Sequence, residues 1–163
     1  MLISTIAATG ENVSKIQVRQ AVLSDIEAVA LLFDEYRQFY GRESNVDAGR
    51  RFLLSRFNHG DSVIFIAAND GEPIGFTQLY PSFSSLSLAR IFVLNDLYVK
   101  PSARRVGAAQ QLLNAAAEYA RTVGAAWLTL STAVTNESAQ ALYEKNGWQR
   151  DHEFLVFNLA VNT

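Results

Sequence analysis

The stretch Val99–Leu113, "VKPSARRVGAAQQLL", decides the fold predicted for this chain. A β-branched run leads into two arginines and a glycine, and an amphipathic helix follows. The first amides of a helix have no internal partner and the helix dipole favours anions, so this arrangement suits a phosphate. Gly107 lets the backbone approach a phosphate oxygen closely, while Ala108 and Ala109 keep side chains out of the way. A surface helix start with two solvated arginines fits the segment equally well, so a second motif is needed.

Predicted strands and helices extend on both sides of this stretch. β-branched runs mark the strands, three-four apolar spacing marks the helices, and the Asp70-Gly71 pair marks a hairpin turn. Strands are predicted at residues 15–21, 62–68, 74–83, 89–99, 125–133 and 153–161, and helices at 24–40, 46–57, 106–123 and 137–146. These segments follow the order β-α-α-β-β-β-α-β-α-β, and with one further strand expected at the end the order is roughly β-α-α-β-β-β-α-β-α-β-β. This predicts an α/β domain with a mixed sheet and helices on both faces.

The composition is that of an ordinary globular protein. Of 163 residues, 49% are hydrophobic and 18% charged, which favours a single domain at residues 15–163 after a flexible tail at residues 1–14. The net charge of −2 argues against nucleic acid as a partner. The sequence has no cysteine, no basic leader at its start and no run of eighteen apolar residues. A cytoplasmic protein that does not bind membranes is therefore expected.

A second motif, "NESAQALYEKNGW" at residues 136–148, follows another predicted strand. Together with "LNDLYVKPSARRVGAAQQLL" it resembles the GCN5-related N-acetyltransferase (GNAT) family. The phosphate signature of that family is Q or R, two residues, G, one residue, then G or A, which here is Arg104, Gly107 and Ala109. The resemblance is specific from Ile91 to Trp148 and compatible elsewhere. It implies a mostly antiparallel central sheet flanked by helices, in agreement with the predicted element order.

The resemblance also implies acetyl-CoA as the cofactor and coenzyme A as the product. Backbone amides of the loop would bind the pyrophosphate, and the preceding strand would pair with the pantetheine arm. The implied cofactor contacts are Leu97, Tyr98, Val99, Arg104, Arg105, Val106, Gly107, Ala108, Ala109, Asn136, Ser138 and Tyr143. Many members have glycine at the position of Arg105 and a basic residue at that of Val106, so the roles of these two side chains depart from the family pattern.

Tyr143 matches the tyrosine that many members of the family use as general acid toward the leaving thiolate. It shares a helix face with Ala139 and Leu142, so a place in the core is the alternative. Proton transfer from a phenol of pKa ~10 to a thiolate of pKa ~8.5 is uphill by about 2 kcal/mol unless the site shifts one of them. A hydrogen bond to the thiolate could therefore suffice.

Asp96 is the predicted general base. An amine of pKa ~10.4 is about three units too protonated at neutral pH, which costs roughly 4 to 5 kcal/mol, and a carboxylate can accept that proton. Asp96 interrupts the apolar strand "IFVLNDLYV", where an unpaired charge is expensive. It is therefore either paired structurally or placed at a site.

The acceptor contacts are expected from three regions. "LNDLYV" and "YPSFSSLS" resemble the lysine and polyamine-type branch of the family, and the first predicted helix often borders the acceptor pocket in that family. The implied substrate contacts are Glu35, Tyr36, Tyr80 and Asn95. Asn95 stands where that branch often has a second acidic residue, and a solvated helix face is the alternative for Glu35. The two histidines have no ligand pattern, so no metal is predicted.

The predicted function is transfer of an acetyl group from acetyl-CoA directly to a primary amine. The acceptor is expected to be a small cationic amine, an amino acid or a polyamine-like molecule, with a protein lysine as an alternative. A non-catalytic acyl-CoA-binding or regulatory module on the same fold is the rival interpretation. The apolar closing strand at residues 153–161 predicts a homodimer if it lies at a sheet edge.

Overall fold

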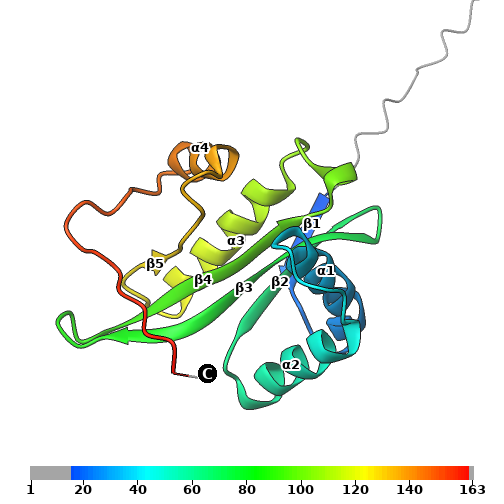
Figure 1. Cartoon of the computed structure of the whole chain (residues 1–163), viewed down its shortest axis with the longest axis horizontal. Coiled ribbons are helices and arrows are strands. Elements are labelled where there is room, and N and C mark those ends of the chain that lie inside the picture. Colours follow the sequence, from blue (N-terminus) through cyan, green and yellow to red (C-terminus); the bar gives the residue numbers. More distant parts are fainter. Residues whose placement is uncertain (1–15, 162–163) are drawn as a thin grey trace, which may run out of the picture. The chain divides into compact units, whose positions relative to one another are not determined.

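The computed structural model describes residues 16–161, so the predicted N-terminal tail lies outside the described residues. The elements are β1 (Ile16–Gln20), α1 (Ile26–Phe39), α2 (Val46–His59), β2 (Val63–Asn69), β3 (Glu72–Ser84), β4 (Ala89–Val99), α3 (Ala108–Thr122), β5 (Leu128–Thr129) and α4 (Glu137–Lys145), as Figure 1 shows. The chain divides into two compact units, the first ending at Leu130 and the second beginning at Ser131. None of the described helices is long and apolar enough to cross a membrane.

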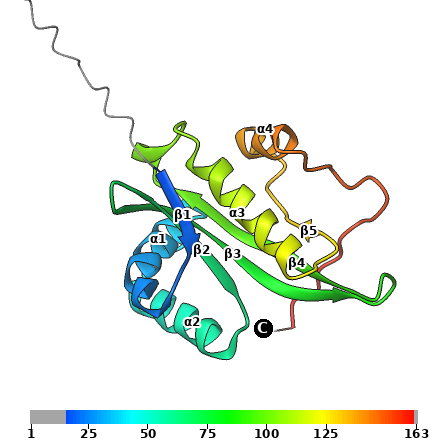
Figure 2. The same cartoon turned by 180° about the vertical axis from the view of Figure 1, so that it is seen from behind.

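The first unit is built on a five-stranded sheet in the order β1-β2-β3-β4-β5. Neighbouring strands are antiparallel except for β4 and β5, which are parallel. β2 and β3 are joined at the predicted hairpin turn, where Asp70 and Gly71 have φ values of 48° and 89°. Helices α1 and α2 cover one face of the sheet and α3 covers the other (Figures 1 and 2). The predicted α/β class and mostly antiparallel sheet are confirmed.

Apolar side chains fill both interfaces between helices and sheet. On the first face, Val29 of α1, Leu53 of α2 and Phe76 of β3 are completely buried. On the second face, Leu112 of α3 is buried and the Tyr119 ring packs on aromatic rings of β2 and β4. Each fully buried side chain of this size contributes roughly 1.5–3 kcal/mol, so the sheet is held from both sides. The central strands of the sheet are therefore supported on both faces.

Two predicted strands differ from the structure. The strand expected at residues 125–133 is reduced to β5, which pairs with β4 only at Phe92 and Val93. The closing strand expected at residues 153–161 is absent, since those described residues form no ladder. Their side chains are exposed, with Phe154 at 74% and Phe157 at 88%. An apolar β-branched run becomes a strand only where a neighbour satisfies its backbone groups, which local pattern does not reveal.

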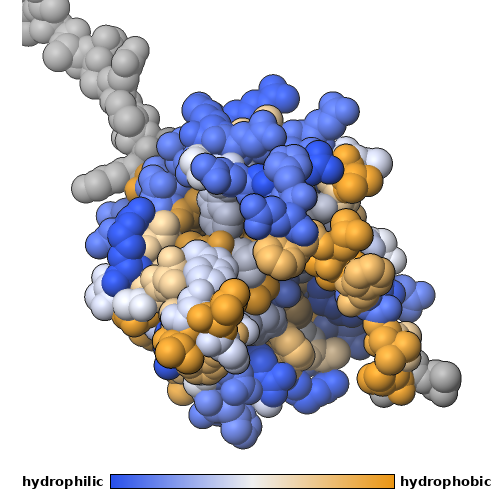
Figure 3. Space-filling model, turned by 90° about the vertical axis from the view of Figure 1, so that its left-hand side faces the viewer, coloured by the Kyte–Doolittle hydropathy of each residue, from blue (hydrophilic) through white to orange (hydrophobic). Residues whose placement is uncertain are grey.

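Much hydrophobic surface remains exposed on the described chain. Figure 3 shows exposed hydrophobic side chains among polar ones. Exposed apolar residues include Leu86 and Leu88 at the β3–β4 hairpin and most of residues 154–161. The predicted homodimer had its sequence basis in the closing strand, so it stays a prediction without that support.

Candidate active site

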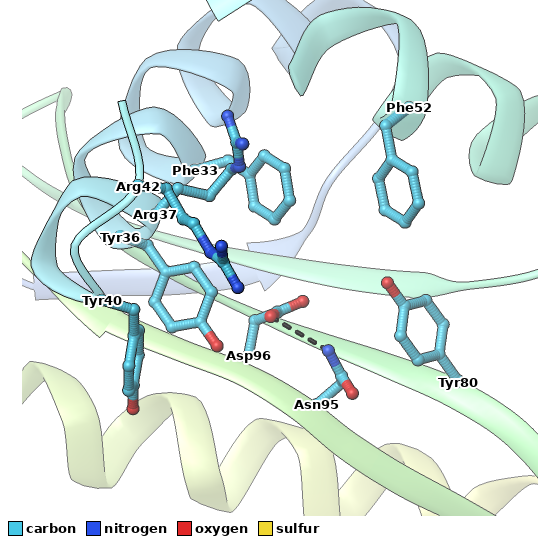
Figure 4. A pocket seen from close by; sticks show the side chains of 9 residues that line it. All are labelled: Phe33, Tyr36, Arg37, Tyr40, Arg42, Phe52, Tyr80, Asn95 and Asp96. Carbon is cyan, nitrogen blue, oxygen red and sulfur yellow. Dashed lines mark hydrogen bonds between the residues drawn. The ribbon is translucent and has the colours of Figure 1, made fainter. Parts of the chain in front are cut away.

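A β-bulge in β4 creates the site. Gln78 of β3 pairs with Asp96 and Leu79 pairs with Leu94, so Asn95 is an extra residue in β4. Successive strand residues normally point to opposite faces, but a bulge can turn two neighbours to the same side. Asn95 Nδ2 donates to Asp96 Oδ1 at 3.1 Å, and both side chains face the same pocket (Figure 4). The bulge therefore presents an amide and a carboxyl together.

Asp96 is both paired and placed at the pocket. Its side chain is buried, and Gln78 Nε2 donates to its Oδ2 at 2.8 Å. Burial raises the pKa of Asp96 above its ordinary value of 3.8, while hydrogen bonds from Gln78, Tyr36 and Asn95 oppose that rise. Asp96 is therefore hydrogen-bonded within the protein and also lines the pocket, while its role as general base stays a prediction. Such a carboxyl is a stronger base than an exposed one.

The pocket has a volume of about 270 Å³ and is lined by nine side chains from α1, α2, β3, β4 and the loop after α1. The lining residues are Phe33, Tyr36, Arg37, Tyr40, Arg42, Phe52, Tyr80, Asn95 and Asp96, all drawn in Figure 4. The structure thus brings together Tyr36, Tyr80, Asn95 and Asp96. It does not place Glu35 in this lining, because the Glu35 carboxylate accepts a hydrogen bond from the Tyr98 hydroxyl at 3.0 Å.

Tyr80 belongs to the same polar network. Gln78 Nε2 donates to the Tyr80 hydroxyl at 3.1 Å as well as to Asp96. Burial, followed by the negative charge of Asp96, raises the pKa of Tyr80 to about 12. Tyr80 is therefore a neutral hydroxyl at physiological pH. It can position a ligand but is a poor proton donor.

Sequence reasoning missed several residues of this site. Three lining residues received no functional role, namely Phe52, Arg37 and Arg42. The buried Gln78, which donates a hydrogen bond to the Asp96 carboxyl, received none either. Arg37 had a signal, since it is a charged residue on the otherwise apolar stripe of the first helix. Gln78 also had one, as a polar residue in the middle of a strand. The position of Arg42 depends on how its loop folds back, which has no local signal.

The predicted phosphate loop forms a helix start of unusual backbone geometry. Gly107 is the N-cap of α3 with φ 89°, and no side chain caps the helix. The amides of the first turn, which begins at Ala108, have no acceptor within the helix. Arg105 has φ 65°, in the left-handed region that favours glycine, which gives a reason for the glycine common in the family there. The loop thus offers free amides at the positive end of a helix dipole.

Two side chains of the loop differ in their surroundings, since Arg104 contacts the protein and Val106 is exposed. Arg104 Nε donates to the carbonyl of Val99 at 3.1 Å, and its guanidinium lies over the Phe39 ring at 5.8 Å. Val106 is 51% exposed and precedes α3, which begins at Ala108 rather than at residue 106 as predicted. Arg104 therefore holds the loop against the end of β4, which leaves the backbone as the main candidate for binding phosphate.

One edge of β4 is available next to this loop. Since β5 pairs with β4 only at Phe92 and Val93, the edge from Leu94 to Val99 pairs with no strand on that side among residues 16–161. This edge includes the three strand residues expected to contact the cofactor, Leu97, Tyr98 and Val99. An extended ligand with amide groups can add to such an edge as a further strand does.

The second unit carries the remaining predicted residues. Asn136 is the N-cap of α4, where its side chain accepts from the amide of Ala139 at 3.2 Å. Ser138 is exposed, and Tyr143 is half-buried with its ring 6.1 Å from that of Trp148. No residue of α4 is fully buried, so Tyr143 is not a core residue of this unit. The cofactor and acid roles of these residues stay predictions.

Comparison with known proteins identifies the class. The model of the acetyltransferase (GNAT) family matches residues 27–148, and the chain belongs to this family. It is 49% identical over 144 residues to the uncharacterized N-acetyltransferase YhfO of Bacillus subtilis (strain 168), covering 88% of this chain and 97% of that protein. The resemblance seen in the sequence is thereby confirmed at the level of the family.

Solved structures agree with this family assignment. The crystal structure of a probable acetyltransferase superposes with a TM-score of 0.86 and 43% identity, covering 90% of this chain and 99% of that one. The aminoglycoside N-acetyltransferase AAC(6')-Iy in complex with CoA superposes with a TM-score of 0.75 at 21% identity, covering 90% of this chain and 95% of that one. The second likeness is one of fold. The protein is therefore an acetyltransferase of the GNAT type.

Proposed function

We propose that this chain transfers an acetyl group from acetyl-CoA directly to a primary amine, with coenzyme A as the product. When bound, acetyl-CoA supplies an acetyl group activated as a thioester. The observation that carries the proposal is the buried carboxyl of Asp96, which lines a pocket on the strand whose other edge is unpaired. A base, an acceptor pocket and a cofactor edge thus share one strand.

The loop and the helix start fit the cofactor. The amides from Arg105 to Ala109 would bind the pyrophosphate, because they lie at the amino end of α3 and Gly107 presents no side chain. The β4 edge from Leu97 to Val99 would pair with the pantetheine arm. The side chains of Asn136 and Ser138 complete the proposed contacts. The solved aminoglycoside acetyltransferase of the same fold holds CoA, which supports this choice of cofactor.

Asp96 would remove the proton from the incoming ammonium. The pKa of its carboxyl is raised by burial, which brings its basicity closer to that of the amine. A positioned base contributes about 10²- to 10⁴-fold to such a reaction. A backbone amide near Leu97 or Tyr98 would stabilise the oxyanion, and the Tyr143 hydroxyl would donate a hydrogen bond to the leaving thiolate. No covalent enzyme intermediate is required.

The acceptor is proposed to be a small primary amine bound by Tyr36, Tyr80 and Asn95. An amino acid, another small cationic amine, a polyamine-like molecule and a protein lysine are the candidate classes, of which the last two follow from the resemblance to the lysine and polyamine-type branch. The volume of about 270 Å³ favours a small molecule or a single side chain.

Thiol release from acetyl-CoA across a panel of amines tests the function. The panel contains amino acids, simple amines, spermidine, an aminoglycoside and a basic peptide, with binding of acetyl-CoA measured in parallel. Turnover of one amine establishes the activity. Tight binding without turnover of any would favour the non-catalytic module, and the absence of binding would contradict the cofactor assignment.

Matched variants test the residues. Asp96→Asn is expected to lower kcat/KM by about 10²-fold or more, whereas Asp70→Asn at the exposed hairpin turn leaves it unchanged. Tyr143→Phe is expected to lower kcat, with Tyr119→Phe, whose ring packs between α3 and the sheet, as the control. Full activity of Asp96→Asn would exclude the base role while leaving the class intact.

The cytoplasmic location and the homodimer are also kept as proposals. The absence of cysteine is the sequence observation behind the first. The exposed apolar side chains of residues 154–161 are compatible with the second. Light scattering at working concentration tests it, and a monomer at every concentration would reject it.

A further inference from the structure

The pocket contains two guanidinium groups in addition to the carboxyl of Asp96. Arg37 lies on α1 and Arg42 lies on the loop that follows, and both line the cavity (Figure 4). Neither is in an ion pair with a carboxylate among residues 16–161, whereas Arg56 nearby is paired with Asp61 at 3.1 Å. The pocket therefore holds two cations and one acid, a net positive charge that a purely cationic acceptor would meet as repulsion.

Arg37 presents part of its side chain to this site. Its Nη1 atom is buried away from solvent and has no hydrogen-bond partner in the described part of the chain, so a ligand would be held by the atoms of Arg37 that line the pocket. A guanidinium offers two parallel N–H groups to an oxoacid anion, so a carboxylate or phosphonate is the natural complement.

Asp34 lies close enough to Arg37 for the two charges to attract, although they form no ion pair within 4 Å among residues 16–161. Its oxygens accept hydrogen bonds from Gln38 Nε2 at 2.8 Å, Ser44 Oγ at 2.7 Å and the Asn45 amide at 2.7 Å. The Asp34 carboxylate therefore accepts its hydrogen bonds from α1 and from the loop before α2. These bonds also fix the loop that carries Arg42 beside the pocket.

The remaining lining is aromatic. The Phe33 and Phe52 rings are stacked with centroids 5.9 Å apart, and the Tyr36 ring meets the Tyr40 ring edge-on at 5.1 Å. A volume of about 270 Å³ suits a small molecule or a single side chain. The aromatic walls suit an apolar or aromatic body.

We infer that the acceptor is a small zwitterion, an amine that carries an oxoacid anion close to its amino group. The amine lies against Asp96 and the anion binds Arg37 and Arg42. This inference rests on the proposed acceptor role of the pocket and narrows it to the amino-acid class and its phosphonate analogues. The same arrangement disfavours polyamines and aminoglycosides, because they carry several positive charges and no anion.

Matched pairs of amines test the inference. L-Phenylalanine is compared with 2-phenylethylamine, and 3-aminopropylphosphonate with propylamine, in both acetyl transfer and binding in the presence of CoA. Spermidine and tobramycin are tested in the same assays as amines that carry several positive charges and no anion. The anionic member of at least one pair is expected to be favoured by about 10- to 100-fold in kcat/KM, the effect of a charge-assisted contact. Preference for the carboxylate or the phosphonate pair tells the two anions apart.

Variants connect that preference to the arginines. Arg37→Gln and Arg42→Gln are each expected to lower the ratio within the favoured pair by about tenfold, mainly through KM, while Arg42→Lys retains part of it. Arg51→Gln, on the exposed side of α2, is the charge-matched control and leaves the ratio unchanged.

The outcomes separate this inference from the proposed function. Acetylation of propylamine or spermidine in preference to every zwitterion would overturn the inference and leave the acetyltransferase proposal standing. Binding of a zwitterion that depends on Arg37, without acetyl transfer, would support the inference and count against the function. If no amine binds or reacts, both are rejected.

Discussion

Gln78 Nε2 donates a hydrogen bond of 2.8 Å to Asp96 Oδ2 across the β3–β4 pair, at the residue where the register shifts. Both side chains are buried, so this bond joins the proposed base to a residue of β3 that does not itself line the pocket. The bond favours the ionised form of Asp96 and opposes the effect of burial on its pKa. Gln78 is therefore a positioning residue for Asp96.

Gln78→Leu should weaken catalysis and change its pH dependence. Loss of the donor raises the pKa of Asp96 further, so the acid limb of the kcat/KM profile moves to higher pH and activity at neutral pH falls about tenfold or more. Thr77→Val is the matched control, because Thr77 Oγ1 donates to the backbone carbonyl of Asp96 rather than to its carboxyl. An unshifted profile in Gln78→Leu would show that the bond is only structural.

Ionisation of Asp96 should cost folding stability. Its pKa in the folded protein is raised above the ordinary value of 3.8, so the folded state binds the proton more tightly than the unfolded state. The contribution of the protonated group is then fully present below about pH 4 and is lost as pH rises through the folded pKa. Asp96→Asn removes this dependence.

Urea unfolding of wild type and Asp96→Asn between pH 4 and 8 measures the effect. The stability of the variant relative to wild type should increase with pH, with Asp70→Asn showing no such slope. A difference that is constant with pH would contradict the raised pKa.

The backbone of the phosphate loop should matter more than the side chain of Arg105. Gly107→Ala forces a left-handed residue at φ 89° and should cost about 1–2 kcal/mol in stability while weakening CoA binding. Arg105→Gly relieves a similar conformation at φ 65°, so its stability should stay within about 1 kcal/mol of wild type.

Calorimetric titration with CoA distinguishes the two variants. Binding by the amides predicts that Arg105→Gly loses less than about tenfold in affinity and that Gly107→Ala loses more. The reverse order would assign the phosphate to the Arg105 side chain.

Gly75 on β3 should be required for the close approach of β4. A Cβ at this position would lie 2.6 Å from the carbonyl oxygen of Tyr98 and 3.1 Å from Val99 Cγ2, so the strand must move. Gly75→Ala should destabilise the fold by about 1–3 kcal/mol and weaken CoA binding through the displaced strand edge.

The control for this variant is Gly60→Ala. It has φ 65° but no atom within 4 Å of the added Cβ, so it should lose stability without any change in CoA affinity. If Gly75→Ala and Gly60→Ala bind CoA with equal affinity, the β4 edge is not part of the cofactor site.

Several features followed from the sequence because their causes are local. The Asp70-Gly71 turn forms where it was predicted, and α2 and α4 begin at their predicted residues, where the side chains of Asn45 and Asn136 cap them. The proposed phosphate motif could be recognised in the same way, since it consists of one loop and one helix start. Asp96 could be singled out because a carboxyl in an apolar strand is costly unless it is paired, and its catalytic role stays a prediction.

Tertiary structure decided the rest. A β-bulge turned Asn95 and Asp96 to one face, Gln78 reached Asp96 from the paired strand, and the loop fixed by Asp34 brought Arg42 beside Arg37. The exposed segment at residues 154–161 shows the same limit, because its apolar pattern is that of a strand but no described strand pairs with it. Sequence pattern specifies what a segment can form locally, whereas strand register and long-range contacts decide which side chains meet.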